Sequence, residues 1–364
     1  MKIQQIETYL AKVPLKKAFK TALRTVTIAE AIIVKITCDN GKVGYGEAPP
    51  THVITGDSIA SISFAINEVL RPALIGMSCL DREQLFAKIN SLLVGNTSAK
   101  AAVDMAIYDC VAQQAEMSLR QYLGGYQSQI ETDYTVSVNS PEEMASDAEE
   151  YVRDGFSMLK IKVGKDEIDT DIQRIQAIRK QVGPNVKIRL DANQGWEPKA
   201  AVRAIQKMED LGLNIEFIEQ PVKAHDIKGL KFVTSHTYIP IMADESVFSA
   251  RDAENVLEQA AADLINIKLM KAGGIHEALK IANLANVFGI SCMVGSMIES
   301  KIGITAAAHF AASQPNIAYY DFDAPLMLSG DLIDGGIQYK GSRIVFGDSF
   351  GLGIQGLREE YLVK

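Results

Sequence analysis

The chain has 364 residues, of which 47% are hydrophobic and 23% charged, and its formal net charge is −8 at pH 7. These values suit a globular protein of two domains, or one barrel with an appendage, and the acidic balance with no long basic run argues against nucleic acid as a partner. Because no stretch reaches about 18 apolar residues and MKIQQIETYL lacks the apolar core of a signal peptide, we expect a cytoplasmic protein that binds no membrane.

The first 126 residues predict a separate α+β domain, because strands come first and helices follow. The three strand-like runs are 2–9, 30–38 and 42–47, with an Asp-Asn-Gly hairpin turn between the last two. The three helical patterns lie at about 58–75, 80–93 and 98–117. Two further segments, 14–27 and 48–58, read as loops.

From residue 127 to residue 323, apolar strand-like runs alternate with helical segments. The runs are 132–138, 158–164, 186–193, 215–221, 239–246, 264–270, 290–296 and 317–323. Between them, apolar residues recur every three or four positions, and several helical segments end at glycine. Eight such periods describe a barrel. Because the chain after the eighth run is glycine-rich and not clearly helical, we predict a TIM-like (β/α)7β barrel, with residues 324–364 returning to the N-terminal domain.

Polar residues stand where these runs end, which is where barrels of this kind carry their active residues. In chain order they are Thr135, Lys160, Lys162, Asp191, Asn193, Glu219, Asp244, Glu245, Lys268, Ser296, Asp321 and Asp323. From Lys162 through Asp191, Glu219, Asp244 and Lys268 to Ser296 the steps are 29, 28, 25, 24 and 28 residues, which is the strand period itself. We therefore expect these side chains to converge on one cavity.

Asp191, Glu219 and Asp244 predict a magnesium site, because three carboxylates on adjacent strands form a hard oxygen site. No His or Cys lies near them in the sequence, which argues against zinc. The alternative is that these acids cap the following helices. Asn193 and Glu245 are expected either to support the ligands or to contact the metal directly.

Lys162 and Lys268 flank the acids in strand order, so they should lie on opposite sides of the metal. A substrate carboxylate at the metal would then have one lysine at each face of its α-carbon, which suits proton abstraction and return. Lys162 must be neutral to act as a base, and the metal, burial and the like charge of Lys160 should lower its pKa. The alternative is that the lysines form structural ion pairs with the acids.

At these positions the sequence resembles the enolase superfamily, in its muconate-lactonizing-enzyme-like branch. The matching motifs are K-x-K at Lys160–Lys162, D-x-N at Asp191–Asn193, E-Q-P at Glu219–Pro221, D-E-S at Asp244–Ser246 and the lysine Lys268. A lysine base with Mg²⁺ at the developing enolate is known chemistry of that superfamily. The resemblance covers the whole chain, including residues 1–126 as an α+β capping domain, and it implies one Mg²⁺ per subunit and a homo-oligomer.

Within that branch the chain is similar to the dipeptide epimerases that act on L-Ala-D/L-Glu. The segment FKTALRTV places Arg24 in the first capping loop, TGDS lies in the second, and DFDAP places Asp321 and Asp323 at the end of strand eight. The resemblance implies Mg-dependent epimerisation of the C-terminal residue of dipeptides from murein, through an enolate, with Lys162 and Lys268 as the two bases. Arg24 should bind the glutamate side chain, the two aspartates the ammonium, and Lys160, Thr135 and Ser296 other parts of the substrate.

Other readings stay open for these residues and for the activity. Arg24 can be a solvated loop residue, Asp321 and Asp323 can form a turn, and Thr135 and Ser296 can be ordinary barrel lining. Muconate cycloisomerase, o-succinylbenzoate synthase and N-acylamino-acid racemase share the lysines and acids, so the barrel core cannot separate them, although the paired aspartates favour a cationic substrate end. A noncatalytic barrel scaffold is the other class, and the complete set of lysines and acids argues against it.

Overall fold

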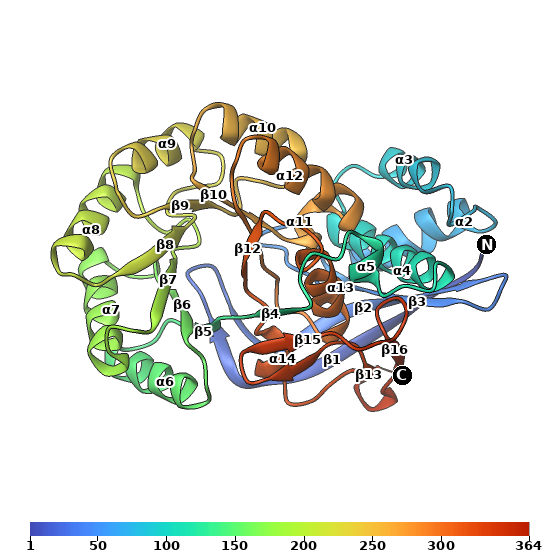
Figure 1. Ribbon diagram of the computed structural model, residues 1–364, viewed down its shortest axis with the longest axis horizontal. Coiled ribbons are helices and arrows are strands. Elements are labelled where there is room, and N and C mark those ends of the chain that lie inside the picture. Colours follow the sequence, from blue (N-terminus) through green and yellow to red (C-terminus); the bar gives the residue numbers. More distant parts are fainter. Residues whose placement is uncertain (364) are drawn as a thin grey trace.

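The computed structural model describes residues 1–363, and its central feature is a curved sheet of eight parallel strands (Figure 1). The strands follow one another around the sheet in chain order. They are β5 (Tyr134–Val136), β6 (Met158–Lys162), β7 (Lys187–Asp191), β8 (Ile215–Glu219), β9 (Ile241–Ala243), β10 (Leu264–Ile267), β11 (Cys292–Val294) and β12 (Ile317–Tyr320). Asp133 N donates to Tyr320 O at 3.4 Å, so the segments at the two ends of the sheet meet and the barrel closes.

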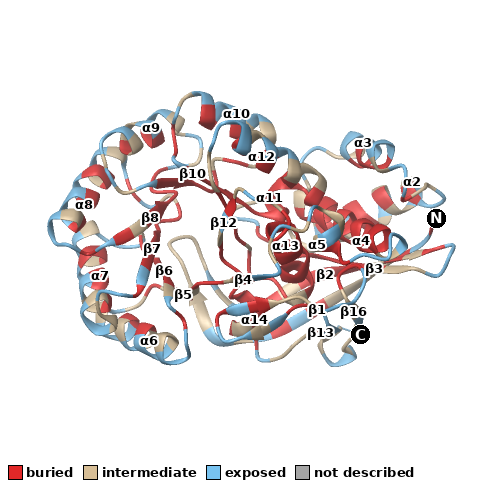
Figure 2. Cartoon of the chain, in the orientation of Figure 1, coloured by how far each residue is buried: buried red, intermediate tan, exposed pale blue. Residues whose placement is uncertain are grey.

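Helices connect the strands and cover the outside of the barrel, with their apolar faces turned inward (Figure 2). They are α6 (Pro141–Arg153), α7 (Ile168–Val182), α8 (Pro198–Asp210), α9 (Ile227–Ser235), α10 (Ala250–Glu258), the short α11 (Leu269–Ala272), α12 (Ile275–Val287) and α13 (Lys301–Ala311). After β12 the described chain forms the four-residue helix α14 (Ala324–Met327), then short strands and a final 3-10 turn. The prediction of a (β/α)7β barrel without a regular last helix is therefore confirmed.

The N-terminal part forms an antiparallel sheet of β1 (Ile3–Lys20), β2 (Thr25–Cys38) and β3 (Val43–Ala48). The prediction of a loop over residues 14–27 is wrong, because β1 and β2 continue through it as one long hairpin. This segment lacks a clear strand pattern, yet tertiary contacts hold it extended. Lys17 Nζ lies 2.7 Å from Asp147 Oδ2 in α6, and Lys20 Nζ donates to Asn139 Oδ1 at 2.7 Å.

Helices pack on one face of this sheet. They are α1 (Ile59–Phe64), the π-helical turn η1 (Ala65–Leu70), α2 (Arg71–Leu74), α3 (Arg82–Leu92), α4 (Thr97–Gln114) and α5 (Leu119–Tyr122). Helix α4 is buried from Ser98 to Ala112, and it approaches β3 very closely because Gly44 and Gly46 present no side chain to it. A Cβ atom on Gly46 would lie 1.9 Å from the carbonyl oxygen of Ala102.

The C-terminal segment lies against β1, as Figure 1 shows. Its elements are β13 (Ile333–Gly335), β14 (Gln338–Lys340), β15 (Arg343–Val345), β16 (Ile354–Leu357) and η2 (Glu359–Tyr361). Strand β15 pairs with β14 and also with the short strand β4 (Gln129–Glu131), which precedes the barrel. Leu332 and Ile333 join an apolar cluster with Val13 and Ile33. The domain boundaries at residues 126 and 323 stay predictions. No helix in the described chain is long and apolar enough to cross a membrane.

We predict that Gly46→Ala destabilises the protein, because the new methyl group would overlap the backbone of α4. Overpacking of a rigid interior typically costs about 1–3 kcal/mol, and contact with backbone rather than with a flexible side chain places this substitution at the upper end. The control is Gly356→Ala, whose Cβ meets no atom within 4 Å. Urea denaturation measures both, and equal midpoints for the two variants would contradict this account of the α4–β3 contact.

Candidate active site

A cavity with about 550 Å³ of unfilled space, part of it open to solvent, lies between the tip of the β1–β2 hairpin and the carboxyl ends of the barrel strands. Its barrel side includes Thr135, Lys160, Lys162, Asn193, Lys268, Ser296, Asp321 and Asp323. Its capping side includes Phe19, Thr21, Leu23, Arg24, Val53 and Ile54. Nine of the residues predicted from the sequence therefore border one cavity. The other four, Asp191, Glu219, Asp244 and Glu245, are fully or almost fully buried and hydrogen-bond or pair with residues of its wall.

Parallel pairing of the strands places a lysine and two acids at the same level of the barrel. Lys162 in β6 is the register partner of Asp191 in β7, and Asp191 is the partner of Glu219 in β8. Successive side chains of a strand alternate faces, so residues in register on neighbouring strands point the same way. The strand-period spacing in the sequence thus becomes a contiguous row of charges at the carboxyl end of the barrel.

Lys160 precedes Lys162 by two residues on β6, so it points to the same side of the sheet, and it is 1% exposed. Its Nζ atom is 2.8 Å from Glu219 Oε2, 2.8 Å from Asp321 Oδ2 and 3.1 Å from Asp191 Oδ2. Burial lowers the pKa of Lys160, but the charges of Asp321, Glu219 and Asp191 outweigh it and raise the pKa well above its ordinary value. Lys160 is therefore a fixed ammonium group.

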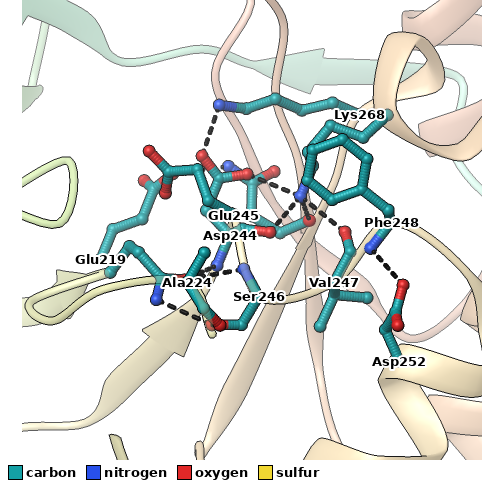
Figure 3. Close-up of polar contacts among 12 residues, drawn as sticks. Glu219, Ala224, Asp244, Glu245, Ser246, Val247, Phe248, Asp252 and Lys268 are labelled. Atoms are coloured by element: carbon teal, nitrogen blue, oxygen red, sulfur yellow. Dashed lines mark hydrogen bonds and ion pairs between the residues drawn. The ribbon is translucent and has the colours of Figure 1, made fainter. Parts of the chain in front are cut away.

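Lys162 and Lys268 each pair with a different acid of the row. Lys162 Nζ donates to Asp191 Oδ2 at 2.6 Å, and Lys268 Nζ donates to Asp244 Oδ2 at 2.6 Å (Figure 3). Both ammonium groups border the same cavity. Burial lowers the pKa of Lys268, whereas Asp244 and Glu219 raise it above its ordinary value overall. The charges of Asp244 and Glu219 therefore hold Lys268 as a cation.

The acids are too crowded to be balanced by the lysines alone. Burial, followed by the charge of Asp191, raises the pKa of Glu219 to about 7, and burial with the charge of Asp244 raises that of Glu245 to about 8. Such shifts mean that neither carboxylate ionises readily without another cation nearby.

The donor set fits a hard divalent cation. Four buried oxygens here accept no well-directed hydrogen bond, namely Asn193 Oδ1, Glu219 Oε2, Asp244 Oδ1 and Glu245 Oε2, although lysine ammonium groups lie within ion-pair distance of two of them. The described His, Cys, Asp and Glu side chains are not preassembled as a metal cage, because Asp191 and Asp244 are turned toward lysines. Carboxylate and amide oxygens are the ligands that Mg²⁺ prefers.

Asn193 and Glu245 stand beside the three acids. Asn193 N donates to Asp191 Oδ1 at 2.9 Å, and its Nδ2 atom donates to Glu245 Oε1 at 3.3 Å. The backbone of Asn193 has φ +40°, a left-handed conformation that costs energy for a residue with a side chain and recurs at functional sites. These contacts orient Asp191 and link it to the loop after β9.

Asp321 and Asp323, which follow β12, differ in their surroundings. Asp321 pairs with Lys160, whereas Asp323 accepts a hydrogen bond from Thr135 N at 2.5 Å. Burial and the charge of Asp321 raise the pKa of Asp323 to about 7. Because only Asp321 of these two acids pairs with a cation among the described residues, this end of the cavity is electronegative.

Arg24 brings a cation to the opposite, capping side. It lies at the tip of the β1–β2 hairpin, is half-buried and lines the cavity. Within residues 1–363 its guanidinium forms no ion pair, and burial lowers its pKa. Phe19 on the same hairpin places its ring centroid 5.9 Å from Lys162 Nζ. The hairpin thus contributes one free cation and one apolar wall.

Sequence reasoning missed Lys271, Gln220 and Asn266. Lys271 is 1% exposed and donates to the carbonyl oxygens of Val247 and Asn266, while its Nζ atom lies 2.7 Å from Asp244 Oδ1. Gln220 accepts from Asp244 N at 2.8 Å, and Asn266 Nδ2 donates to Glu219 Oε1 at 2.8 Å. The only available signal was position in the sequence: Gln220 is the middle residue of the E-Q-P motif, and Asn266 and Lys271 lie close to Lys268.

Comparisons with known proteins cover nearly the whole chain. Residues 5–124 match the mandelate racemase/muconate lactonizing enzyme N-terminal domain, and residues 143–360 match the enolase C-terminal domain-like family. The L-Ala-D/L-Glu epimerase of Bacillus subtilis is 64% identical over 98% of this chain and 97% of its own length. A substrate-liganded structure of the Bacillus subtilis epimerase superposes with a TM-score of 0.98 at 63% identity, covering 98% of this chain and 100% of the other.

A dipeptide epimerase from Enterococcus faecalis, solved with Mg and the dipeptide L-Leu-L-Tyr, superposes with a TM-score of 0.95 at 45% identity, over 98% of this chain and 100% of the other. The two family matches coincide with the capping sheet and the barrel described above, and the relatives share both parts. The chain therefore belongs to the mandelate racemase/muconate lactonizing enzyme family of the enolase superfamily.

Proposed function

We propose that this protein is an epimerase that interconverts L-Ala-L-Glu and L-Ala-D-Glu, dipeptides derived from murein, by inverting the α-carbon of the C-terminal residue. The observation that carries the proposal is the pair of lysines, Lys162 and Lys268, which border one cavity and contact different acids of one carboxylate cluster. Inversion at carbon needs a base on each face, and these two side chains supply them. The similarity to dipeptide epimerases supports the same assignment.

In the forward direction one lysine, as neutral amine, takes the α-proton and becomes an ammonium group. The electron pair of the broken C–H bond moves into the carboxylate and forms an enolate. The other lysine, as ammonium, returns a proton to the opposite face. We assign Lys162 to the L substrate and Lys268 to the D product, and the reverse reaction exchanges their roles.

Asp191, Glu219 and Asp244 would hold one Mg²⁺ per subunit. When bound, the cation would supply positive charge that stabilises the enolate. It would also balance the charge of the acids that otherwise pair with the lysines. Lys160, fixed by three carboxylates, adds a permanent positive charge next to the reacting carboxylate. Asn193 and Glu245 orient the acids.

Substrate selection follows from the charges at the two ends of the cavity. The ammonium group of the dipeptide lies at its far end and needs an anion, which Asp321 and Asp323 supply. The side-chain carboxylate of the C-terminal glutamate needs a cation, and Arg24 can offer it a bidentate fork. Thr135 and Ser296 line the wall between these ends. A cytoplasmic location and a homo-oligomeric state complete the proposal, and cell fractionation and light scattering would test them.

We predict that metal removal abolishes epimerisation reversibly. Glu219→Gln removes both a ligand and a charge from the site where negative charge develops, and loss of one such stabilising group costs about 10²–10³ in kcat. Circular dichroism of an L-Ala-L-Glu solution follows the reaction. It is recorded first with enzyme in EDTA and then again after Mg²⁺ is added in excess. Full activity of the metal-stripped protein in EDTA would refute the metal requirement.

We predict that Lys162→Ala and Lys268→Ala each abolish interconversion of the two diastereomers. Each variant keeps one base, so each should still exchange the α-proton with D₂O for only one diastereomer. Proton NMR measures exchange and inversion in the same sample. A Lys268→Ala variant that interconverts the dipeptides at the normal rate would exclude the two-base mechanism. If the wild type exchanges the α-proton of no dipeptide or N-acyl amino acid with D₂O, the protein is not an epimerase.

We predict that Arg24→Met lowers kcat/KM for L-Ala-L-Glu by tens- to thousands-fold, because truncating one partner of a buried charge pair costs about 2–5 kcal/mol. The same variant should affect L-Ala-L-Leu much less, since that side chain offers no carboxylate. Asp321→Asn is the companion variant and should relax discrimination against N-acetylated dipeptides. An equal effect of Arg24→Met on both substrates would show that Arg24 does not read the side chain.

A further inference from the structure

Two buried carboxyl groups outside the lysine–acid cluster meet where the cap touches the barrel. Glu47 in β3 is 1% exposed, and Glu299, in the loop between β11 and α13, is 2% exposed. A Cβ atom on Gly303 would lie 2.3 Å from Glu299 Oε2 and 3.2 Å from Glu47 Oε2, so both groups converge on one spot beside the first turn of α13. Two acids this close in a dry environment resist ionising together.

Glu47 has the surroundings of an anion. Its oxygens accept hydrogen bonds from Ser300 N at 2.8 Å, Ser300 Oγ at 2.7 Å and Gly303 N at 2.8 Å. These donors belong to the N-terminus of the barrel helix α13, where free N–H groups and the helix dipole favour negative charge. A residue of the cap thus completes the end of a barrel helix.

Glu299 has the surroundings of a neutral acid. Its Oε1 atom accepts from Met297 N at 2.8 Å, and within residues 1–363 it forms no ion pair. Burial, with the charge of Glu47, raises the pKa of Glu299 to about 8, while the Met297 bond and the charge of Lys268 act against this shift. Burial also raises the pKa of Glu47, but the three donors of Ser300 and Gly303 oppose that rise.

The pair is connected to the cavity through a short loop. Ser296, Met297 and Ile298 line the cavity. The next two residues are Glu299, which binds Met297 N, and Ser300, which binds Glu47. The position of this wall therefore depends on both carboxyl groups at once.

We propose that Glu47 and Glu299 carry one proton between them, with Glu47 ionised and Glu299 neutral, and that the pair is a positioning device that fastens the loop Ser296–Ile298 to the cap. Its effect on turnover rests on the proposed epimerase function. The protonation pattern does not, because it follows from the burial and the hydrogen bonds alone.

Glu299→Gln tests the neutral acid, since an amide replaces it without change of charge. The variant should fold and keep kcat/KM within about twofold of the wild type at pH 7. Between about pH 5 and pH 8 the native wild type holds a proton that the unfolded chain has lost, so wild-type stability should fall with rising pH relative to Glu299→Gln. Above about pH 8 the difference should level off. Thermal unfolding midpoints measure this, with the exposed Glu254→Gln as the control for loss of one carboxyl group.

Glu47→Gln should behave differently, because its amide N–H₂ would face a donor of Ser300 or Gly303. We expect a lower midpoint at every pH and a rise in KM larger than the fall in kcat, as the cavity wall loosens. Infrared spectra provide a direct readout, since a band of a protonated carboxylic acid should disappear in Glu299→Gln.

Three outcomes would overturn the proposal: an unfolded Glu299→Gln, a midpoint difference independent of pH, or an infrared acid band identical in that variant and the wild type. If the wild type shows no epimerisation, the proposed function fails, whereas the midpoints and the band still decide the protonation of the pair.

Discussion

Burial of charge at the carboxyl ends of the barrel strands is the constraint on which the site depends. An isolated ammonium or carboxylate group cannot be taken out of water without a large cost, so each must meet a partner of opposite charge at hydrogen-bond distance. Parallel strands meet this requirement through register, because Lys162, Asp191 and Glu219 are direct neighbours across the sheet. The same pairing that makes burial tolerable brings the lysines together with the carboxylates that we propose as metal ligands.

The cap is attached to the barrel by buried carboxyl groups that accept hydrogen bonds from helix ends. Asp104 in α4 accepts from Ile275 N at 2.6 Å and from His276 N at 3.1 Å, at the start of α12. Glu47 does the same at the start of α13. Two buried acids of the cap thus satisfy two barrel helix ends, which would otherwise leave N–H groups unpaired. Since these contacts fix the cap, they also fix the hairpin that carries Arg24.

The residues proposed for catalysis and those proposed for substrate selection come from different parts of the chain. The barrel supplies the lysines and acids, whereas Arg24 and Phe19 reach the cavity on a hairpin of the cap. Under the proposed function, changes at the hairpin tip would alter the accepted side chain without disturbing the buried ion pairs. The relative from Enterococcus faecalis was solved with L-Leu-L-Tyr, which has no acidic side chain. A family with this arrangement can vary its substrates while keeping one barrel core.

The sequence by itself determined the barrel, its missing last helix and the residues at its strand ends, because strand period and helix period are local properties of the chain. It misassigned residues 14–27, whose extended shape depends on the pairing of β1 with β2 and on contacts with the barrel such as Lys17–Asp147. Only the tertiary structure revealed that Lys271 supports Asp244 and that Glu47 meets Ser300, 253 residues away. The reason is physical. A hydrogen bond between residues far apart in the chain depends on how the elements pack, and local sequence patterns do not reveal that packing.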